Sequence, residues 1–358
     1  MKQLFFILLL TAFYQISTAQ GCVAIRNNGA TCAMTGAHRD KSKEPEWTLG
    51  INSRYFKSYK HFVGTEEQKQ RVDAGTEVIN KSFSTEVSLS HHINSRWSVG
   101  FYAPIINNIR SSKYEHYGNS SKSPNARRKT SAFGLGDVRI AAYYWITEPS
   151  KMSKFNVQLG AGIKLPSGDY RYQDYFWKND SSKTLGPVDQ SIQLGDGGTG
   201  LSAEYNAYYS VTKGLNIYSN GYYLFNPREQ NGVSTARGGT VSAGAVANGS
   251  DVMSVADQFM VRLGASFSAD RFLFSGGIRV EGVPAKDLIG GSNGFRRPGY
   301  VVSVEPVVSY KLSKTQLYLS VPLAVERNRT QSAPDKIRTQ ITGVYTQGDA
   351  AFADYSIN

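Results

Sequence analysis

The sequence predicts an all-β chain, a transmembrane antiparallel up-and-down barrel of about twelve strands. Apolar and polar residues alternate along many stretches, and the clearest is 155–165, where Phe, Val, Leu, Ala, Ile and Leu alternate with Asn, Gln, Gly, Gly and Lys. Successive strand side chains point to opposite faces. Behind an export signal, this pattern places Val157, Leu159 and Ile163 toward lipid and Gln158 and Lys164 toward a wet lumen.

The first residues predict a cleaved export signal. Lys2 precedes an apolar core at 4–10, and small residues at 17–19 form a cleavage site. This core is too short to cross a bilayer as a helix, and no other window holds about eighteen apolar residues. We therefore expect a signal peptide at 1–19, a periplasmic or lumenal N-terminal segment at 20–45, and an outer-membrane barrel at 46–358.

The two cysteines, Cys22 and Cys32, lie close together just after the cleavage site. Export leads to an oxidising compartment, so we predict a disulfide between them that closes a small loop. The alternative is a lipoprotein acylated at Cys22, but the sequence lacks the branched apolar residue expected three positions earlier. No haem or zinc spacing occurs, and we expect neither a cofactor nor a metal.

Each predicted strand alternates with a period of two and is bounded by turn residues. The strands are expected at 47–52, 83–93, 97–103, 137–146, 155–165, 201–211, 215–225, 255–267, 272–282, 300–312, 317–325 and 350–357. Short turns such as 94–96, 148–150 and 212–214 alternate with long loops at about 107–131, 166–198 and 226–252. Outer-membrane barrels have short periplasmic turns and long extracellular loops, so this rhythm supports the same fold.

The end of the chain raises a question about closure. Bacterial barrels commonly finish on a terminal aromatic residue, whereas this chain ends Tyr355-Ser356-Ile357-Asn358. The last predicted strand is also short. Pairing between the first and last strands therefore depends on whether 350–357 forms a full strand, and ten or fourteen strands would also fit the pattern.

The inward positions of these strands carry charges of both signs and amides. We predict that the lumen is lined by Arg54, Glu86, Arg139, Gln158, Lys164, Glu204, Asn206, Arg262, Arg279, Glu281 and Glu305. Charged rings set the selectivity of pores. Alternatively, these residues pair across neighbouring strands and fill a narrow barrel that has no through-path.

Three glycine-rich segments stand at strand ends: Gly134-Leu135-Gly136-Asp137-Val138, Gly162 to Asp169, and Leu194 to Gly200. Each is explained by a turn, and the third lacks the lysine and helix of a phosphate loop. Together they resemble the outer-membrane family of the MetA pathway of phenol degradation. The resemblance implies a transporter-like barrel, with a link to aromatic compounds in some members.

The formal net charge is +12 and the pI about 9.5. Export argues against nucleic acid as the partner. Lysine and arginine concentrate in predicted loops, such as 127–129 and 296–297, which favours solvated loop charge over contact with lipopolysaccharide or recruitment of anionic solutes.

We therefore expect a channel or transporter for small solutes, aromatic or amphipathic ones among them, in the outer membrane of a Gram-negative bacterium. Its surroundings would be membrane lipid and lipopolysaccharide. A structural or partner-binding barrel without a through-pore is the first alternative. An outer-membrane hydrolase is the second, although no nucleophile, base and orienting group stand at matching strand heights and no enzyme is expected. His116 beside Glu115 leaves loop chemistry open.

Overall fold

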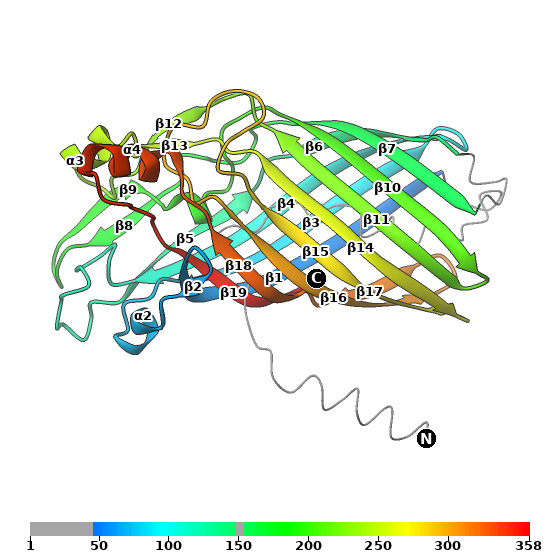
Figure 1. Ribbon diagram of the computed structural model, residues 1–358, viewed down its shortest axis with the longest axis horizontal. Helices are drawn as coiled ribbons and strands as arrows, with labels where there is room; N and C mark the ends of the chain where they lie inside the picture. The colour runs from blue at the N-terminus through cyan, green and yellow to red at the C-terminus, as the bar shows by residue number, and fades with distance from the viewer. Residues whose placement is uncertain (1–45, 148–153) are drawn as a thin grey trace, which may run out of the picture.

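The computed structural model describes residues 46–147 and 154–358, which form a closed antiparallel barrel of 12 strands (Figure 1). The predicted signal peptide, the N-terminal segment with Cys22 and Cys32, and the turn at 148–150 lie outside the described residues. In chain order the wall consists of β1 (Trp47–Val63), β3 (Ile79–His92), β4 (Trp97–Ser112), β5 (Arg128–Leu135) with β6 (Arg139–Trp145), β7 (Phe155–Lys164), β10 (Gly200–Thr212), β11 (Leu215–Phe225), β14 (Gln258–Ala269), β15 (Phe272–Val283), β16 (Gly299–Lys311), β17 (Gln316–Ser320) with β18 (Leu323–Arg329), and β19 (Ala350–Ile357).

Two positions in the wall are occupied by broken strands. β5 and β6 both pair with β4, and the chain leaves the ladder between them at 136–138. β17 and β18 both pair with β16 and are separated by Val321 and Pro322. Proline has no N–H to donate to a ladder, which explains why the strand expected at 317–325 is interrupted there.

The first and last strands close the barrel. β19 pairs with β1 from Tyr55 opposite Ile357 to Phe62 opposite Ala350. Its registered contact with β18 is confined to Leu323 opposite Tyr355. The expected strand at 350–357 thus forms with its expected limits, and the chain end without a terminal aromatic still completes the ring.

The outer surface of the wall is apolar. Leu159 and Ile163 are 47% and 48% exposed, whereas Lys164 is 6% exposed and faces the interior. Exposed rings gather near the short turns: Trp47, Trp97, Phe155, Tyr209, Phe267 and Phe272. Aromatic girdles of this kind mark the interface between lipid and water. The apolar face of the strands is therefore the outer, lipid-facing one, as predicted, and the barrel spans an outer membrane.

The long loops stand at one end of the barrel (Figure 1) and contain more structure than the sequence predicts. The stretch expected as a loop at 166–198 holds the hairpin β8 (Gln173–Trp177) and β9 (Lys183–Pro187) and the short helix η4 (Gln190–Ile192). The stretch at 226–252 holds β12 (Gln230–Ser234), α3 (Ala243–Ala247) and the start of β13 (Val252–Ser254). β2 (Glu66–Glu67), α2 (Lys69–Asp73) and α4 (Ala333–Thr342) complete this end.

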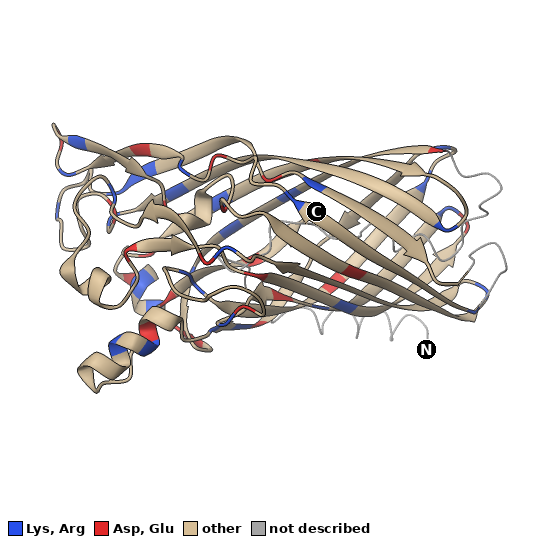
Figure 2. Cartoon of the chain, turned by 90° about the horizontal axis from the view of Figure 1, so that it is seen from above, with Lys and Arg blue, Asp and Glu red and all other residues tan. Residues whose placement is uncertain are grey.

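The loop expected at about 107–131 is shorter, because β4 continues to Ser112 and β5 begins at Arg128. In the described ranges no helix has the length and apolarity that crossing a membrane requires. Figure 2 shows charged residues concentrated at the loop-bearing end, while the strand ribbons are mostly tan.

Candidate functional site in the barrel lumen

An apolar layer crosses the lumen on the side of the short turns. Trp145, Tyr208, Tyr218 and Val307 form one buried cluster. β6, which carries Trp145, and β16, which carries Val307, are separated by β7, β10, β11, β14 and β15, so they face each other across the ring. Their membership of one cluster means that side chains bridge the whole width of the barrel at this height.

A cluster of charged residues, here called the floor, also spans the lumen. It consists of Arg54, Arg262, Arg279, Glu281 and Glu305, each at most 2% exposed. Arg54 on β1 reaches Glu281 on β15 at 3.0 Å, and Arg279 contacts Glu281 at 2.7 Å and Glu305 at 3.4 Å. Arg262 contacts Glu305 at 2.9 Å. Buried charges must be paired in this way because an uncompensated charge in a low-dielectric interior is costly.

A second polar group lies against β4, β6 and β10. Arg139 pairs with Glu204, and its guanidinium lies 4.1 Å from the ring centroid of Tyr102. The Tyr143 hydroxyl donates to Glu204 at 3.2 Å. Glu86 is 8% exposed and stands on the inner face of β3. These residues belong to β3, β4, β6 and β10, whereas those of the floor belong to β1, β14, β15 and β16.

An amide ladder links three neighbouring strands. Asn220 on β11 donates to Asn206 on β10 at 2.9 Å, and Asn206 donates to Gln158 on β7 at 3.1 Å. The three residues are directly opposite one another in the strand registers. The inner face of these strands is therefore a continuous polar surface.

A cavity of about 130 Å³, here called the chamber, lies between the floor and the loops. Its clearest wall is built by β1, β3 and β4, whose registers place inward residues in rows. Arg54 is opposite Ser84, and Ser84 is opposite Ile106; in the next row, Phe56 is opposite Ser82, and Ser82 is opposite Asn108. The other side is formed by the η4 segment, residues near the start of β14, and Arg296 and Arg297.

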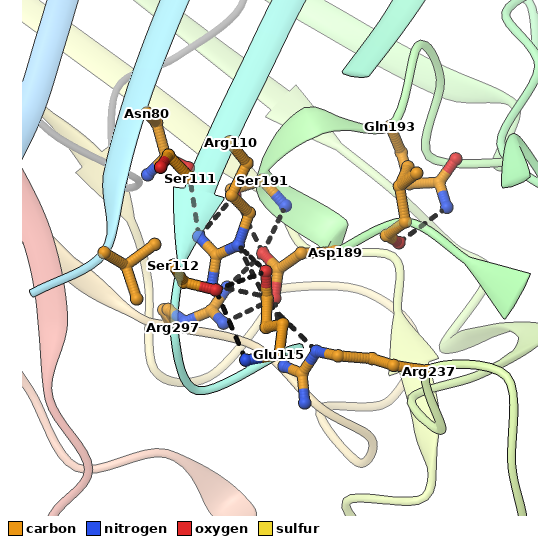
Figure 3. Close-up of polar contacts among 12 residues, drawn as sticks. Asn80, Arg110, Ser111, Ser112, Glu115, Asp189, Ser191, Gln193, Arg237 and Arg297 are labelled. Atoms are coloured by element: carbon orange, nitrogen blue, oxygen red, sulfur yellow. Dashed lines mark hydrogen bonds and ion pairs between the residues drawn. The ribbon is translucent and has the colours of Figure 1, made fainter. Parts of the chain in front are cut away.

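An ion-pair cluster, here called the roof, lies on the loop side of the chamber, which its member Arg297 lines. Figure 3 shows its contacts. Its members are Arg110, Glu115, Asp189, Arg237 and Arg297. Asp189 accepts two hydrogen bonds from Arg297, at 2.9 and 2.7 Å, and lies 3.4 Å from Arg110 and 3.5 Å from Arg237. Glu115 accepts from Arg110 at 2.8 Å and from Arg237 at 2.9 Å. Apart from Arg110 on β4, the members stand on four different loops, so the roof ties those loops together.

The roof holds its carboxylates ionised. Burial alone would raise the pKa of Asp189, but Arg110 and Arg297 outweigh it and hold that pKa well below its usual range. The pKa of Glu115 is likewise lowered, because Arg110 and Arg237 outweigh the desolvation of the carboxyl. Both groups therefore carry their charge at any pH that a cell surface normally meets.

The structure separates His116 from its neighbour Glu115. The His116 ring accepts a hydrogen bond from the Trp177 backbone N–H at 3.0 Å and lies 5.7 Å from the Phe176 ring. Burial lowers the pKa of His116 to about 4. Glu115 points instead to the arginines of the roof, so the two residues do not form a catalytic pair. Within the described part of the chain, no group of three or more His, Cys, Asp or Glu residues could hold a metal ion.

The three glycine-rich segments meet at one junction. Asp137 accepts hydrogen bonds from the backbone N–H groups of Gly168 and Asp196, at 3.0 and 3.1 Å. Lys164 forms ion pairs with Asp137 and with Asp196. A side chain at Gly195 would collide with Asp137, because a Cβ there would lie 2.5 Å from the Asp137 carboxylate. These segments are thus parts of one contact beside the break between β5 and β6, and not three separate turns.

Among the roof residues, Glu115 was considered for loop chemistry beside His116, whereas Arg110, Asp189 and Arg237 were not among the sequence candidates. Each lies in a region that the sequence predicts as loop, and their partners are up to 122 positions away. Arg296 and Arg297 were interpreted as solvated loop charge, and this was wrong. Arg296 is 2% exposed and binds both oxygens of Asp287, at 2.6 and 2.7 Å.

Comparisons with known proteins give a general likeness only. No family model and no curated protein matches the chain, so the resemblance drawn from the glycine-rich segments stays a prediction. Among solved structures, the chain is similar to the COG4313 outer membrane channel from Pseudomonas putida F1, with 11% identity, coverage of 88% of this chain and 97% of that chain, and a TM-score of 0.49.

Two further structures are similar at lower scores. The CymD monoaromatic hydrocarbon channel shows 10% identity, coverage of 94% and 96%, and a TM-score of 0.40. The Ralstonia pickettii toluene transporter TbuX shows 12% identity, coverage of 88% and 78%, and a TM-score of 0.38. These scores are too low to bear on the substrate of this chain.

Proposed function

We propose that this barrel is an outer-membrane channel that admits small solutes to the chamber and passes them to the periplasm. One observation carries the proposal: the chamber wall presents hydroxyl groups that the protein itself does not use. Ser82 and Ser84 line the chamber and are half-buried, and their side-chain hydroxyl groups have no hydrogen-bond partner among the described residues. A barrel interior that served only as filling would gain by pairing such groups, as the floor does.

The elements around the chamber suggest where access is controlled. The floor residues belong to strands that are joined by ladders of backbone hydrogen bonds. The roof residues belong mainly to separate loops, which are joined there by side-chain contacts. Loops open at a lower free energy than ladders of backbone hydrogen bonds. We therefore infer that solutes enter when the roof loops separate, and that the floor and the apolar layer yield by side-chain movement.

The test is transport by the purified full chain. Planar-bilayer recordings should show discrete conductance steps, and liposomes that contain the protein should swell in solutions of small solutes. Trp145→Ala, which thins the apolar layer, should increase both signals. Absence of conductance and swelling in the wild type and in the variant alike would remove the transport proposal.

The alternative is a structural or partner-binding barrel without a through-pore. The apolar layer favours it, because Trp145, Tyr208, Tyr218 and Val307 bridge the lumen. Deletion of residues 20–45 or of the loop with α4 would then abolish capture of a stable partner and leave membrane permeability unchanged. An outer-membrane hydrolase is the remaining alternative. Hydrolysis of phospholipid or peptide substrates, abolished by a single lumenal or loop substitution, would support it.

A preference for aromatic or amphipathic solutes rests on the resemblance of the glycine-rich segments. The lumenal rings of Tyr102, Tyr143, Tyr208 and Tyr218 could contact such solutes, and this preference would appear as faster liposome uptake of an aromatic alcohol than of an aliphatic one. Binding of lipopolysaccharide by the cationic loops is a further part of the proposal.

A further inference from the structure

The sign of the charge at the chamber wall indicates which solutes it can hold. Arg54, Arg296 and Arg297 line the chamber, but the carboxylates that pair with them, Glu281, Asp287 and Asp189, do not. Asp196 is the carboxylate of the lining, and it is ion-paired with Lys164. The lining therefore contains three arginines and one carboxylate.

The clusters above and below the chamber have the same bias. The floor has three arginines and two carboxylates, and the roof also has three arginines and two carboxylates. The junction of Lys164 with Asp137 and Asp196 has one excess negative charge and offsets one of these. By formal charge these three clusters together carry one excess positive charge, and the group of Arg139, Glu204 and Glu86 carries one excess negative charge, so the positive excess is local to the chamber lining. In a partly desolvated space, such an excess attracts a small anion.

The uncharged groups specify more than the sign of the charge. Ser82 and Ser84 offer O–H donors that are not used by the described protein, and an oxyanion accepts such donors. Asn108 is 5% exposed, lines the chamber and donates to the Ile192 carbonyl, while its Oδ1 has no partner among the described residues. That oxygen requires a donor, which a hydroxyl group on the solute supplies. An aromatic hydrocarbon would leave both kinds of group unsatisfied.

The volume of the chamber indicates the size of the solute that fits. Its 130 Å³ is close to the roughly 150 Å³ of an engineered cavity that holds benzene, so the chamber has room for a solute of roughly six heavy atoms. We infer that the chamber is a binding site for a small oxyanion that also bears a hydroxyl group, of the kind found in a three-carbon hydroxycarboxylate or in hydrogenphosphate. The inference rests on the proposed entry of solutes into the lumen.

The experiment measures binding at equilibrium, by calorimetry on the detergent-purified full chain. The probes are glycerate, inorganic phosphate, glycerol and benzyl alcohol. Glycerate or phosphate should bind, whereas neutral glycerol and aromatic benzyl alcohol should not at the same concentration. The double variant Ser82→Val/Ser84→Val should weaken binding of the oxyanion at least tenfold. Thr85→Val, on the opposite face of β3, is the matched control and should bind as the wild type does.

If the double variant does not fold, the wild type still decides the matter. Its thermal midpoint should rise with the concentration of glycerate or phosphate and stay constant with glycerol, because a ligand that binds the folded state stabilises it. Stronger binding of benzyl alcohol than of either oxyanion, or unchanged oxyanion affinity in the folded double variant, would overturn the inference. Binding without flux would retain this site and remove the channel proposal, and flux without oxyanion binding would do the reverse.

Discussion

Neutralising Asp189 is the sharpest test of the roof. The Asp189→Asn variant keeps the shape of the side chain but removes the charge to which Arg297 donates two hydrogen bonds and which faces Arg110 and Arg237. Glu115 would then be the one carboxylate opposite three arginines. Removing one partner of a buried ion pair costs about 3–5 kcal/mol. At about 1.4 kcal/mol for each factor of ten, the equilibrium between closed and open loops should shift by more than a hundredfold.

The assay is limited trypsin digestion of the folded barrel, followed at the bond after Arg237. Arg237 is held by Glu115 at 2.9 Å and by Asp189, so cleavage requires the roof to open. When opening and closing are fast, the cleavage rate follows the population of the open form. Asp189→Asn should raise this rate at least a hundredfold. Asp180→Asn, an exposed aspartate of the β8–β9 loop, is the control and should leave it unchanged.

Acid should reproduce the effect only at low pH. The folded-state pKa values of Asp189 and Glu115 are lowered, so their contribution to closure is complete above the ordinary carboxyl range. It declines as the pH falls through the lowered values. Trypsin is inactive there, so opening is followed by pepsin digestion of the same loops. If trypsin cleaves the wild type and Asp189→Asn after Arg237 at the same rate, the roof is not the element that closes the barrel.

Three further predictions concern the wall, the apolar layer and a loop histidine. Ile278→Arg places a charge near the middle of the lipid-facing wall and should lower the free energy of unfolding in bilayers by about 2–4 kcal/mol, whereas Ile341→Arg on the exposed face of α4 should change it little. Trp145→Ala should enlarge the single-channel conductance, and Trp97→Ala on the outer girdle should not. Burial lowers the folded-state pKa of His116 to about 4, below its unfolded pKa. The neutral ring therefore stabilises the fold fully above the unfolded pKa, and this contribution to stability is lost as the pH falls from the unfolded pKa to about 4. His116→Asn should make hydrogen exchange in β8, corrected for intrinsic rates, independent of pH between 6.5 and 4.

The membrane-spanning wall could be predicted because lipid imposes a pattern on it. Wherever a strand crosses the apolar band, every second residue must be apolar, so the strands at 215–225 and 350–357 were predicted with the limits they have. Beyond the band both faces of the wall are wet. β4 continues through Asn107 to Ser112, paired with β3 and β5, without an apolar face. The pairing persists there while the sequence signal disappears, which is why this stretch was predicted as a loop.

The sequence predicts which residues point into the barrel, but not which of them contact one another. Parity along each strand shows that Arg54 and Glu281 belong inside the barrel. Their contact joins residues 227 positions apart and depends on the stagger of five strands around the ring. The junction of Asp137, Gly168 and Gly195 has the same origin, since each segment alone reads as a turn. Registers between distant strands carry no signal in a single sequence, so neither contact could be derived from it.

The distribution of charge between strands and loops bears on how a solute would pass. A buried ion pair adds little stability over apolar packing, so a floor of five charged residues is poorly explained as a stabilising device. It does keep the lumen polar behind a wall whose outward residues at neighbouring positions, such as Ile278 and Val304, are apolar and exposed. The floor cannot move away from the path as a unit, because its residues stand on paired strands, whereas the roof can. If the barrel is the channel that we propose, solute in the chamber exchanges first with the outside, and the step into the periplasm depends on side-chain movement in the floor and in the apolar layer.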